Sequence, residues 1–260
     1  MPAPPTDAFE RKIDYLRLSV TDRCNLRCTY CMPRDGVPKL PHHEILTYEE
    51  ILTAARVVIG MGISKIRITG GEPLVRKDIL TLCGQISKIP GIRSLSITTN
   101  GVLLAQFAEG LREAGIQRIN VSLDTLRPEK FAAITRHDYF PQVLAGIKAA
   151  EEAGLSPIKL NAVILRGIND DEIEDLASLT LRHPYHVRFI EFMPIKPDSD
   201  DCNRDQFVPA SEILERLSRL APLERSDDAQ ANGPALHYRF SGAPGKIGII
   251  SPVSQHFCPK

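Results

Sequence analysis

Three cysteines stand within eight residues near the start of the chain, and their spacing suggests a metal centre. Cys24, Cys28 and Cys31 form a C-x3-C-x2-C pattern and make up half of the six cysteines. Three is an odd number, so the thiols cannot all be paired in disulfides among themselves. A structural zinc site needs a fourth ligand, and His42 and His43 do not have the spacing of a zinc finger. Thiolates are the usual ligands of iron–sulfur clusters, and three of them leave one iron of a four-iron cluster open. The triplet therefore favours an iron–sulfur cluster over zinc.

The remaining cysteines carry less information. Cys83 lies in ILTLCGQI, a helical pattern, and is expected to be a small buried hydrophobic residue. Cys202 lies in the charged stretch PDSDDCNRDQ, and Cys258 lies in HFCPK. No second cluster motif follows from these three positions alone.

Composition indicates an ordinary globular chain. Its 260 residues are 43% apolar and 25% charged, and Lys+Arg equals Asp+Glu at 32 each, so no net charge favours nucleic acid. No apolar run is long enough to span a membrane, and the first 14 residues lack a secretory pattern and read as a disordered lead-in. We therefore expect a cytoplasmic protein with reduced thiols, without nucleic-acid or membrane partners.

Strand-like and helix-like patterns alternate along the chain. Helices are expected at about 47–60, 76–88, 103–114, 128–134, 140–153, 170–182 and 209–220. Strands are expected at 15–20, 64–69, 93–98, 117–123, 157–165, 185–192 and 235–240, with a loop over 222–234. Six β–α alternations predict an α/β fold with a parallel sheet and right-handed crossovers.

The strands alternate apolar with polar residues, although buried parallel strands are usually apolar throughout. The polar positions are Arg17, Ser19, Lys65, Arg67, Thr69, Ser96, Thr98, Asn120, Ser122, Lys159 and Asn161. If the apolar positions pack under the helices, the polar positions line the inside of a barrel that keeps a cavity. Inward-facing cations indicate an anionic ligand such as a phosphate. The alternative is that some of these strands expose one face to solvent.

The stretch TGGEP, residues 69–73, follows the second strand directly. Gly70 and Gly71 permit a close backbone approach, and Pro73 suits the start of a helix. A loop at this end of a β/α barrel is placed to bind a ligand. Glu72 has a second interpretation, as a first-turn charge that stabilises the following helix.

The cysteine triplet, with Tyr30 before its last member, resembles the signature of the radical S-adenosylmethionine (SAM) superfamily. The resemblance implies a 4Fe–4S cluster whose open iron binds SAM, and cleavage of SAM to a 5′-deoxyadenosyl radical that takes hydrogen from the substrate. It also implies a partial (βα)6 TIM-like barrel, in agreement with the number of alternations. TGGEP resembles the superfamily loop that accepts the SAM amino group.

Longer segments resemble one family, the GTP 3′,8-cyclases of molybdenum cofactor biosynthesis. They are YLRLSVTDRCNLRCTYCMP, KIRITGGEPLVRKD, TTNG, INVSLDTL, KLNAV, RFIEFMP and IGIISPVSQHFC, from residue 15 to 258. The resemblance implies SAM contacts at Tyr30, Gly71, Ser122 and Met193, and GTP contacts at Arg17, Arg67, Thr98 and Lys159. Two alternatives stay open: Met193 as core filler, and Tyr30 as a packing residue beside the cluster.

The end of the chain departs from the family pattern. Family members hold a second cluster with three cysteines in this region, and only Cys258 stands here. We expect a barrel over residues 15–220 and the start of a C-terminal extension, short relative to the family, over 221–260. We also expect one cluster, and we doubt cyclase activity of the chain as written.

The resemblance implies several partners. They are GTP, an electron donor such as flavodoxin or ferredoxin, and a downstream cyclic pyranopterin monophosphate synthase, with a homodimer as an open alternative. Two other functions stay open, a peptide-modifying radical SAM enzyme and a non-catalytic iron–sulfur carrier. The cationic barrel face argues against the first, and TGGEP against the second.

Overall fold

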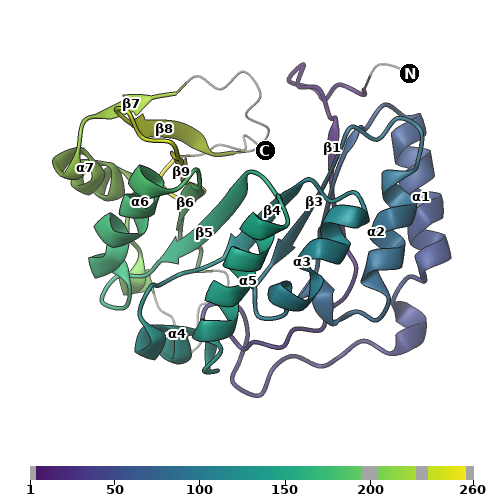
Figure 1. Cartoon of the computed structure of the whole chain (residues 1–260), viewed down its shortest axis with the longest axis horizontal. Coiled ribbons are helices and arrows are strands. Elements are labelled where there is room, and N and C mark those ends of the chain that lie inside the picture. The colour runs from purple at the N-terminus through teal and green to yellow at the C-terminus, as the bar shows by residue number, and fades with distance from the viewer. Residues whose placement is uncertain (1–3, 195–203, 227–233, 256–260) are drawn as a thin grey trace. The chain divides into compact units, whose positions relative to one another are not determined.

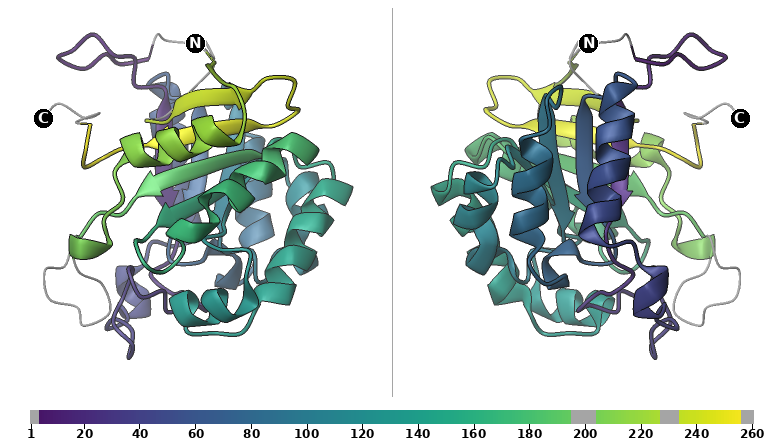
Figure 2. Two further views of the ribbon diagram at one scale, coloured as in Figure 1. Left: turned by 90° about the vertical axis from the view of Figure 1, so that its left-hand side faces the viewer. Right: turned by 90° about the vertical axis from the view of Figure 1, so that its right-hand side faces the viewer.

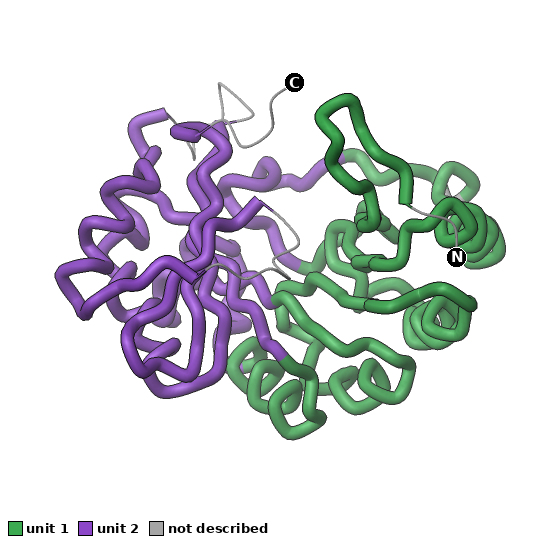
Figure 3. Tube along the Cα trace, turned by 90° about the horizontal axis from the view of Figure 1, so that it is seen from above, with its two compact units in different colours: residues 1–25, 38–120, 142–156 green, residues 26–37, 121–141, 157–260 purple. Residues whose placement is uncertain are grey.

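The structure, a computed structural model, describes residues 4–194, 204–226 and 234–255. The chain forms two compact units (Figure 3). The first unit comprises residues 1–25, 38–120 and 142–156, and the second comprises residues 26–37, 121–141 and 157–260. Because the chain passes between the units several times, each is built from segments that are distant in sequence.

The first unit is a parallel sheet with helices along one face (Figure 1). Its strands β1 (Tyr15–Ser19), β2 (Lys65–Thr69) and β3 (Ser94–Thr99) are hydrogen-bonded in that order. The helices α1 (Tyr48–Gly60), α2 (Ile79–Ser87) and α3 (Leu104–Glu113) follow them in turn, and most of α5 (Phe140–Glu152) belongs to this unit. β4 (Arg118–Ser122) begins in the first unit and ends in the second.

The second unit is a mixed sheet with two helices packed against its middle. Its strands are ordered β5 (Ile158–Ile164), β6 (His186–Glu191), β9 (Lys246–Ile250), β8 (Leu236–Phe240) and β7 (Leu223–Arg225). The first three are parallel, and β8 and β7 continue antiparallel. Helices α6 (Ile173–Arg182) and α7 (Ala210–Leu220) pack on each other and on β6, while α4 (Pro128–Thr135) follows β4 (Figure 2).

Burial follows the alternation in the sequence. In β5, the apolar positions Ile158, Leu160 and Ile164 are buried, and the polar positions Lys159 and Asn161 are only half-buried. β2 has the same pattern, with Ile66 and Ile68 buried between half-buried polar residues. The apolar parity therefore forms the core under the helices, as the sequence predicts.

Most predicted elements are confirmed to within a few residues, and the exceptions have local causes. The helix expected from residue 76 begins at Ile79, because Pro73–Val75 is a 3-10 turn and Asp78 has a left-handed φ of 58°. The loop predicted over 222–234 contains β7, whose Leu-Glu-Arg sequence is too short to show a period. β9 was not predicted; it pairs parallel to β6 and antiparallel to β8.

Glu191 ties together three segments of the second unit. Its carboxylate is 1% exposed. It accepts from the N–H of Ala210 at 2.7 Å, where α7 begins, and from the N–H groups of Val253 and Ser254 at 3.0 Å each. No side chain at Pro209 caps α7, so Glu191 satisfies an N–H that the helix start leaves unpaired.

Among the described residues, none of the helices has both the length and the apolar character that a membrane span requires.

Replacing Glu191 with alanine should lower the free energy of unfolding by about 1–3 kcal/mol, the cost of one buried donor left without an acceptor. That donor is the N–H of Ala210, whereas the N–H groups of Val253 and Ser254, both exposed residues, can bond to water instead. Denaturant titration of the variant against wild type measures the loss. Exposed Glu224, on β7, provides the control, and its alanine variant should stay within about 0.5 kcal/mol of wild type. Equal losses for both variants would show that the hydrogen bonds of Glu191 do not stabilise the fold.

Candidate functional site

The second half of the cysteine motif is a tight turn in the second unit. The N–H groups of Cys31 and Met32 both donate to the Cys28 carbonyl, at 2.9 and 3.1 Å. Cys28 is half-buried and Cys31 is exposed. The spacing C-x2-C thus places two thiols in one turn.

Arg136, which follows α4, stabilises this turn through hydrogen bonds to backbone carbonyls. Its guanidinium donates to the carbonyls of Arg27 at 2.8 Å and Met32 at 3.0 Å. The Arg27 N–H donates to the Thr135 carbonyl at 3.1 Å. Arg136 has a left-handed φ of 61°, which is uncommon for a residue other than glycine and persists only where surrounding contacts fix it.

Tyr30, between the two cysteines, is anchored through its side chain. Its hydroxyl donates to Asp124 Oδ2 at 2.7 Å, and the Val163 N–H donates to Asp124 Oδ1 at 2.8 Å. The ring packs on Leu165 and Phe192. Burial raises the pKa of Asp124 to about 6, against the lowering effect of these two hydrogen bonds. Burial, followed by the charge of Asp124, holds the pKa of Tyr30 well above its usual value.

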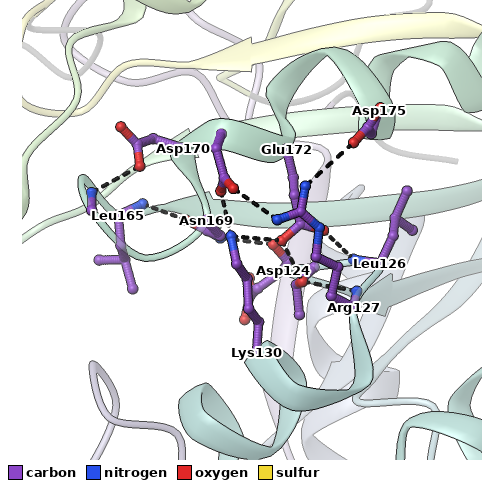
Figure 4. Close-up of polar contacts among 12 residues, drawn as sticks. Asp124, Leu126, Arg127, Lys130, Leu165, Asn169, Asp170, Glu172 and Asp175 are labelled. Atoms are coloured by element: carbon purple, nitrogen blue, oxygen red, sulfur yellow. Dashed lines mark hydrogen bonds and ion pairs between the residues drawn. The ribbon is translucent and has the colours of Figure 1, made fainter.

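Asn169 and Glu172 complete the network around Asp124 (Figure 4). Asn169 donates to the carbonyls of Asp124 and Val163 at 2.7 and 2.9 Å. Glu172 is fully buried and accepts from the Thr125 hydroxyl and the Leu126 N–H, both at 2.7 Å. Hydrogen bonds from Asn169 and to Glu172 therefore connect the loop after β4 to the loop after β5.

Cys24, the first cysteine, lies in the first unit beside the end of β3. Its Sγ is 3.8 Å from the Asn100 side-chain nitrogen, which also donates to Asn25 Oδ1 at 2.7 Å. Asn100 follows β3 directly in TTNG. The sequence motif thus places an amide donor against the first thiol.

The three thiols of the motif are of the kind that iron–sulfur clusters take as ligands. Cys24, Cys28 and Cys31 are in no disulfide and keep some exposure, whereas burial raises the pKa of Cys83 to about 12. Within residues 4–194, 204–226 and 234–255, no three His, Cys, Asp or Glu side chains converge on one ion. Cys202 and Cys258 lie outside the described residues.

The TGGEP loop packs against the chain's own backbone. A Cβ at Gly70 would lie 2.6 Å from the Thr21 carbonyl oxygen, and one at Gly71 would lie 2.4 Å from that of Arg23. Glu72 is 1% exposed and accepts from the Leu74 N–H at 3.0 Å, so it caps the following turn as the second interpretation proposed. It also accepts from the Thr99 hydroxyl and the Asn100 N–H, at 2.8 and 2.6 Å. The two glycines are therefore explained by packing of the loop against residues 21–23.

Two arginines stand beside each other on neighbouring strands of the first unit's sheet. Arg17 of β1 pairs with Arg67 of β2 in register. The Arg67 guanidinium lies 5.3 Å from the Tyr15 ring centroid, and burial, with the charge of Arg17 acting the same way, lowers its pKa. Paired like charges destabilise a sheet. Three buried atoms without a hydrogen-bond partner also lie at the polar positions of these strands: Arg67 Nε, Thr98 Oγ1 and Asn120 Oδ1. Cations and unsatisfied polar atoms therefore share this face of the first unit's strands.

A second cationic row crosses the second unit. Lys159, His186 and Lys246 occupy one register line across β5, β6 and β9. Arg188 is 6% exposed, and Gly248 opposite leaves room for it, since a Cβ there would lie 2.9 Å from Arg188 Cγ. Burial lowers the pKa of His186 to about 3, together with the charges of Lys159, Lys246, Arg188 and His237. His186 is therefore neutral amid cations.

The other predicted contacts stand at the ends of strands in the second unit. Ser122 ends β4 and is half-buried. Met193 follows β6 and is 45% exposed, which argues against a role as core filler. The sequence assigned no role to Asn100, Asp124, His186, Arg188 or Lys246. Asn100, Asp124 and Arg188 stand in quoted motifs, but Tyr30 and Asp124 are 94 residues apart, and nothing local predicts their contact.

Comparisons with known proteins agree with this arrangement. The Radical SAM superfamily model matches residues 18–180, and the Molybdenum Cofactor Synthesis C model matches residues 185–260. A GTP 3′,8-cyclase from Moorella thermoacetica is 52% identical over 254 residues, which are 98% of this chain and 78% of the relative. One from Geobacter sulfurreducens is 51% identical, over 97% of this chain and 77% of the relative.

The fold also has solved counterparts. TYW1 with a lysine-pyruvate adduct bound superposes with a TM-score of 0.59 at 18% identity, over 84% of this chain and 77% of that one. The predicted partial (βα)6 barrel is thereby confirmed. The chain belongs to the radical SAM superfamily and, within it, to the GTP 3′,8-cyclase family.

Proposed function

We propose that this chain is a GTP 3′,8-cyclase, which joins ribose C3′ to guanine C8 to form (8S)-3′,8-cyclo-7,8-dihydroguanosine 5′-triphosphate. The family membership supports the reaction class. The paired arginines of the first unit are the observation that carries the proposal of a highly charged nucleotide. Arg17 is exposed and Arg67 is half-buried, and two neighbouring like charges become favourable when a polyanion binds between or beside them.

The proposed roles follow the motifs residue by residue. Cys24, Cys28 and Cys31 hold a 4Fe–4S cluster, and Tyr30, Gly71, Ser122 and Met193 contact SAM. Arg17, Arg67, Thr98 and Lys159 contact GTP, and Cys258 stands in the region where family members hold a second cluster. The Tyr30 side chain is already bound to Asp124, which supports a SAM contact through its backbone.

The chain's own residues supply binding and positioning. When bound, the cluster and SAM supply the one-electron chemistry that breaks a sugar C–H bond, for which no side chain is basic enough. The cations neutralise the triphosphate, and the polar strand positions orient the ribose and base. His186, neutral in its cationic row, can donate or accept a hydrogen bond without adding a further charge.

Partners and location extend this proposal. A cytoplasmic enzyme of this kind takes its electron from a flavodoxin- or ferredoxin-like donor. Its cyclised product passes to a cyclic pyranopterin monophosphate synthase.

Replacing Cys28 with alanine should abolish reductive SAM cleavage, because a cluster that lacks one thiolate is labile. Iron content and 5′-deoxyadenosine are measured after anaerobic reconstitution and reduction, with GTP present. Cys83→Ala is the matched control and should retain both, since Cys83 is buried in α2. Cleavage retained by Cys28→Ala would overturn the ligand assignment. A wild-type protein that forms no 5′-deoxyadenosine would indicate a carrier, and hydrogen transfer from C3′-labelled GTP would establish the cyclase.

Replacing Lys159 or Arg67 with alanine should weaken GTP binding about tenfold or more. Each charge-assisted contact contributes roughly 1.5–3 kcal/mol, and 1.4 kcal/mol is about tenfold in affinity. SAM binding should stay nearly unchanged. The affinities for GTP and for SAM are each measured by calorimetry on reconstituted protein. Arg118→Ala is the control, because Arg118 is exposed on β4. Equal losses of GTP and SAM affinity would indicate a structural role.

Replacing His186 with glutamine should make the protein less sensitive to acid. The folded pKa of His186, about 3, lies below its usual 6.5, so the unfolded chain binds more protons between these values. The contribution of His186 to the free energy of unfolding is fully present above about pH 6.5. It falls as the pH drops below that value, by up to about 1.4 kcal/mol per pH unit. Asp124, with its raised pKa, acts with the opposite sign, so the variant is compared with wild type at each pH.

The measurement is denaturant unfolding at intervals from pH 7 to pH 4. The difference between variant and wild type should grow in favour of the variant as the pH falls. GTP should flatten the wild-type curve, because a bound anion offsets the surrounding cations and raises the pKa of His186. Parallel curves for both proteins would show that His186 is not held neutral.

A further inference from the structure

Asn100 presents a hydrogen-bond donor to the first thiol of the cysteine motif. Its Nδ2 lies 3.8 Å from Cys24 Sγ, within reach of an N–H···S hydrogen bond. All residues of this contact belong to the first unit. The family comparisons and the motif assign no such role to Asn100.

The orientation of the Asn100 amide is fixed by its neighbours. The Val102 N–H donates to Asn100 Oδ1 at 3.1 Å, and a backbone N–H can only donate. The oxygen is thereby identified, and the NH2 group must face the other way, toward Asn25 and Cys24. One of its hydrogens goes to Asn25 Oδ1 at 2.7 Å, which leaves the second for the sulfur.

The backbone of Asn100 is fixed as well. Its N–H donates to Glu72 Oε2 at 2.6 Å, and Glu72 also accepts from the Thr99 hydroxyl. The Gly101 N–H donates to Thr99 Oγ1 at 3.1 Å, which closes the turn after β3. A donor held in this way costs little further ordering when the sulfur becomes a thiolate.

We propose that Asn100 is a positioning residue that donates a hydrogen bond to the Cys24 thiolate and thereby sets the stability and reduction potential of the cluster. This inference rests on the proposed cluster role of Cys24. Hydrogen bonds to cluster sulfurs are among the factors that set cluster potentials. Reduction adds negative charge to the sulfurs, so a donor stabilises the reduced form and raises the potential.

The test compares two variants that change the charge equally. Asn100→Asp keeps an acceptor for Val102 and loses the donor to Cys24. Asn25→Asp adds the same charge next to Cys24 and keeps both the acceptor of the amide and the donor to the sulfur. Asn100→Ala removes the donor without adding charge. The readouts are the midpoint potential of the reconstituted cluster, followed by electron paramagnetic resonance, and the rate of iron release to a chelator.

Asn100→Asp should lower the potential further than Asn25→Asp does, and Asn100→Ala should lower it without any change of charge. A tenfold change in the one-electron reduction equilibrium corresponds to about 59 mV. Iron release should accelerate about tenfold in both Asn100 variants, the lower range for loss of a partner to a metal ligand. Thermal unfolding of the cluster-free proteins identifies any variant that loses its fold, and the other Asn100 variant then decides the comparison.

Equal shifts in Asn100→Asp and Asn25→Asp, with Asn100→Ala unchanged from wild type, would overturn the inference and leave only a field effect. If wild type itself binds no cluster, the proposed function fails instead. The two failures are therefore distinguishable in the same experiment.

Discussion

Buried carboxylates that bind backbone N–H groups hold the loops of both units in place. Glu72, Asp124, Glu172 and Glu191 are each at most 7% exposed. Each accepts from at least one backbone N–H: Glu72, Glu172 and Glu191 from a loop or helix start, and Asp124 from Val163 near the end of β5. A buried carboxylate without such partners would be strongly unfavourable, and a buried N–H without an acceptor would be nearly as costly per group. The two requirements satisfy each other where strands end, which is where the loops that carry the candidate ligands begin.

These carboxylates and the cations have separate tasks. The carboxylates named above accept hydrogen bonds from the backbone. Arg67 lies in register with Arg17, and Lys159 shares a register line with His186 and Lys246. Such rows cost stability in the free protein. These register lines therefore gather positive charge on strand faces of a chain whose formal net charge is zero.

The sequence was sufficient for most of the elements and for the buried apolar side of β2 and β5, because both depend on local periodicity. It was insufficient for contacts made across long separations. TGGEP shows the difference: its glycines and its acid were correctly singled out, but the close approach that requires them is to residues 21–23 of the same chain. β9 was missed because its pairing partners, β6 and β8, decide its structure rather than any period of its own. The Asp124 contact with Tyr30 was missed for the same reason.

The residues beside the cysteines follow a common logic despite their different chemistry. Tyr30 is held by Asp124, Cys24 faces Asn100, and the turn of Cys28 and Cys31 is held by Arg136. In each case a polar group from a distant strand end or helix end fixes a short loop that has little secondary structure of its own. A loop of this kind cannot hold its thiols in place by packing alone, since it buries few apolar side chains. Its geometry must therefore come from directed hydrogen bonds, and for that reason the residues that matter beside the ligands are amides, acids and an arginine rather than further cysteines.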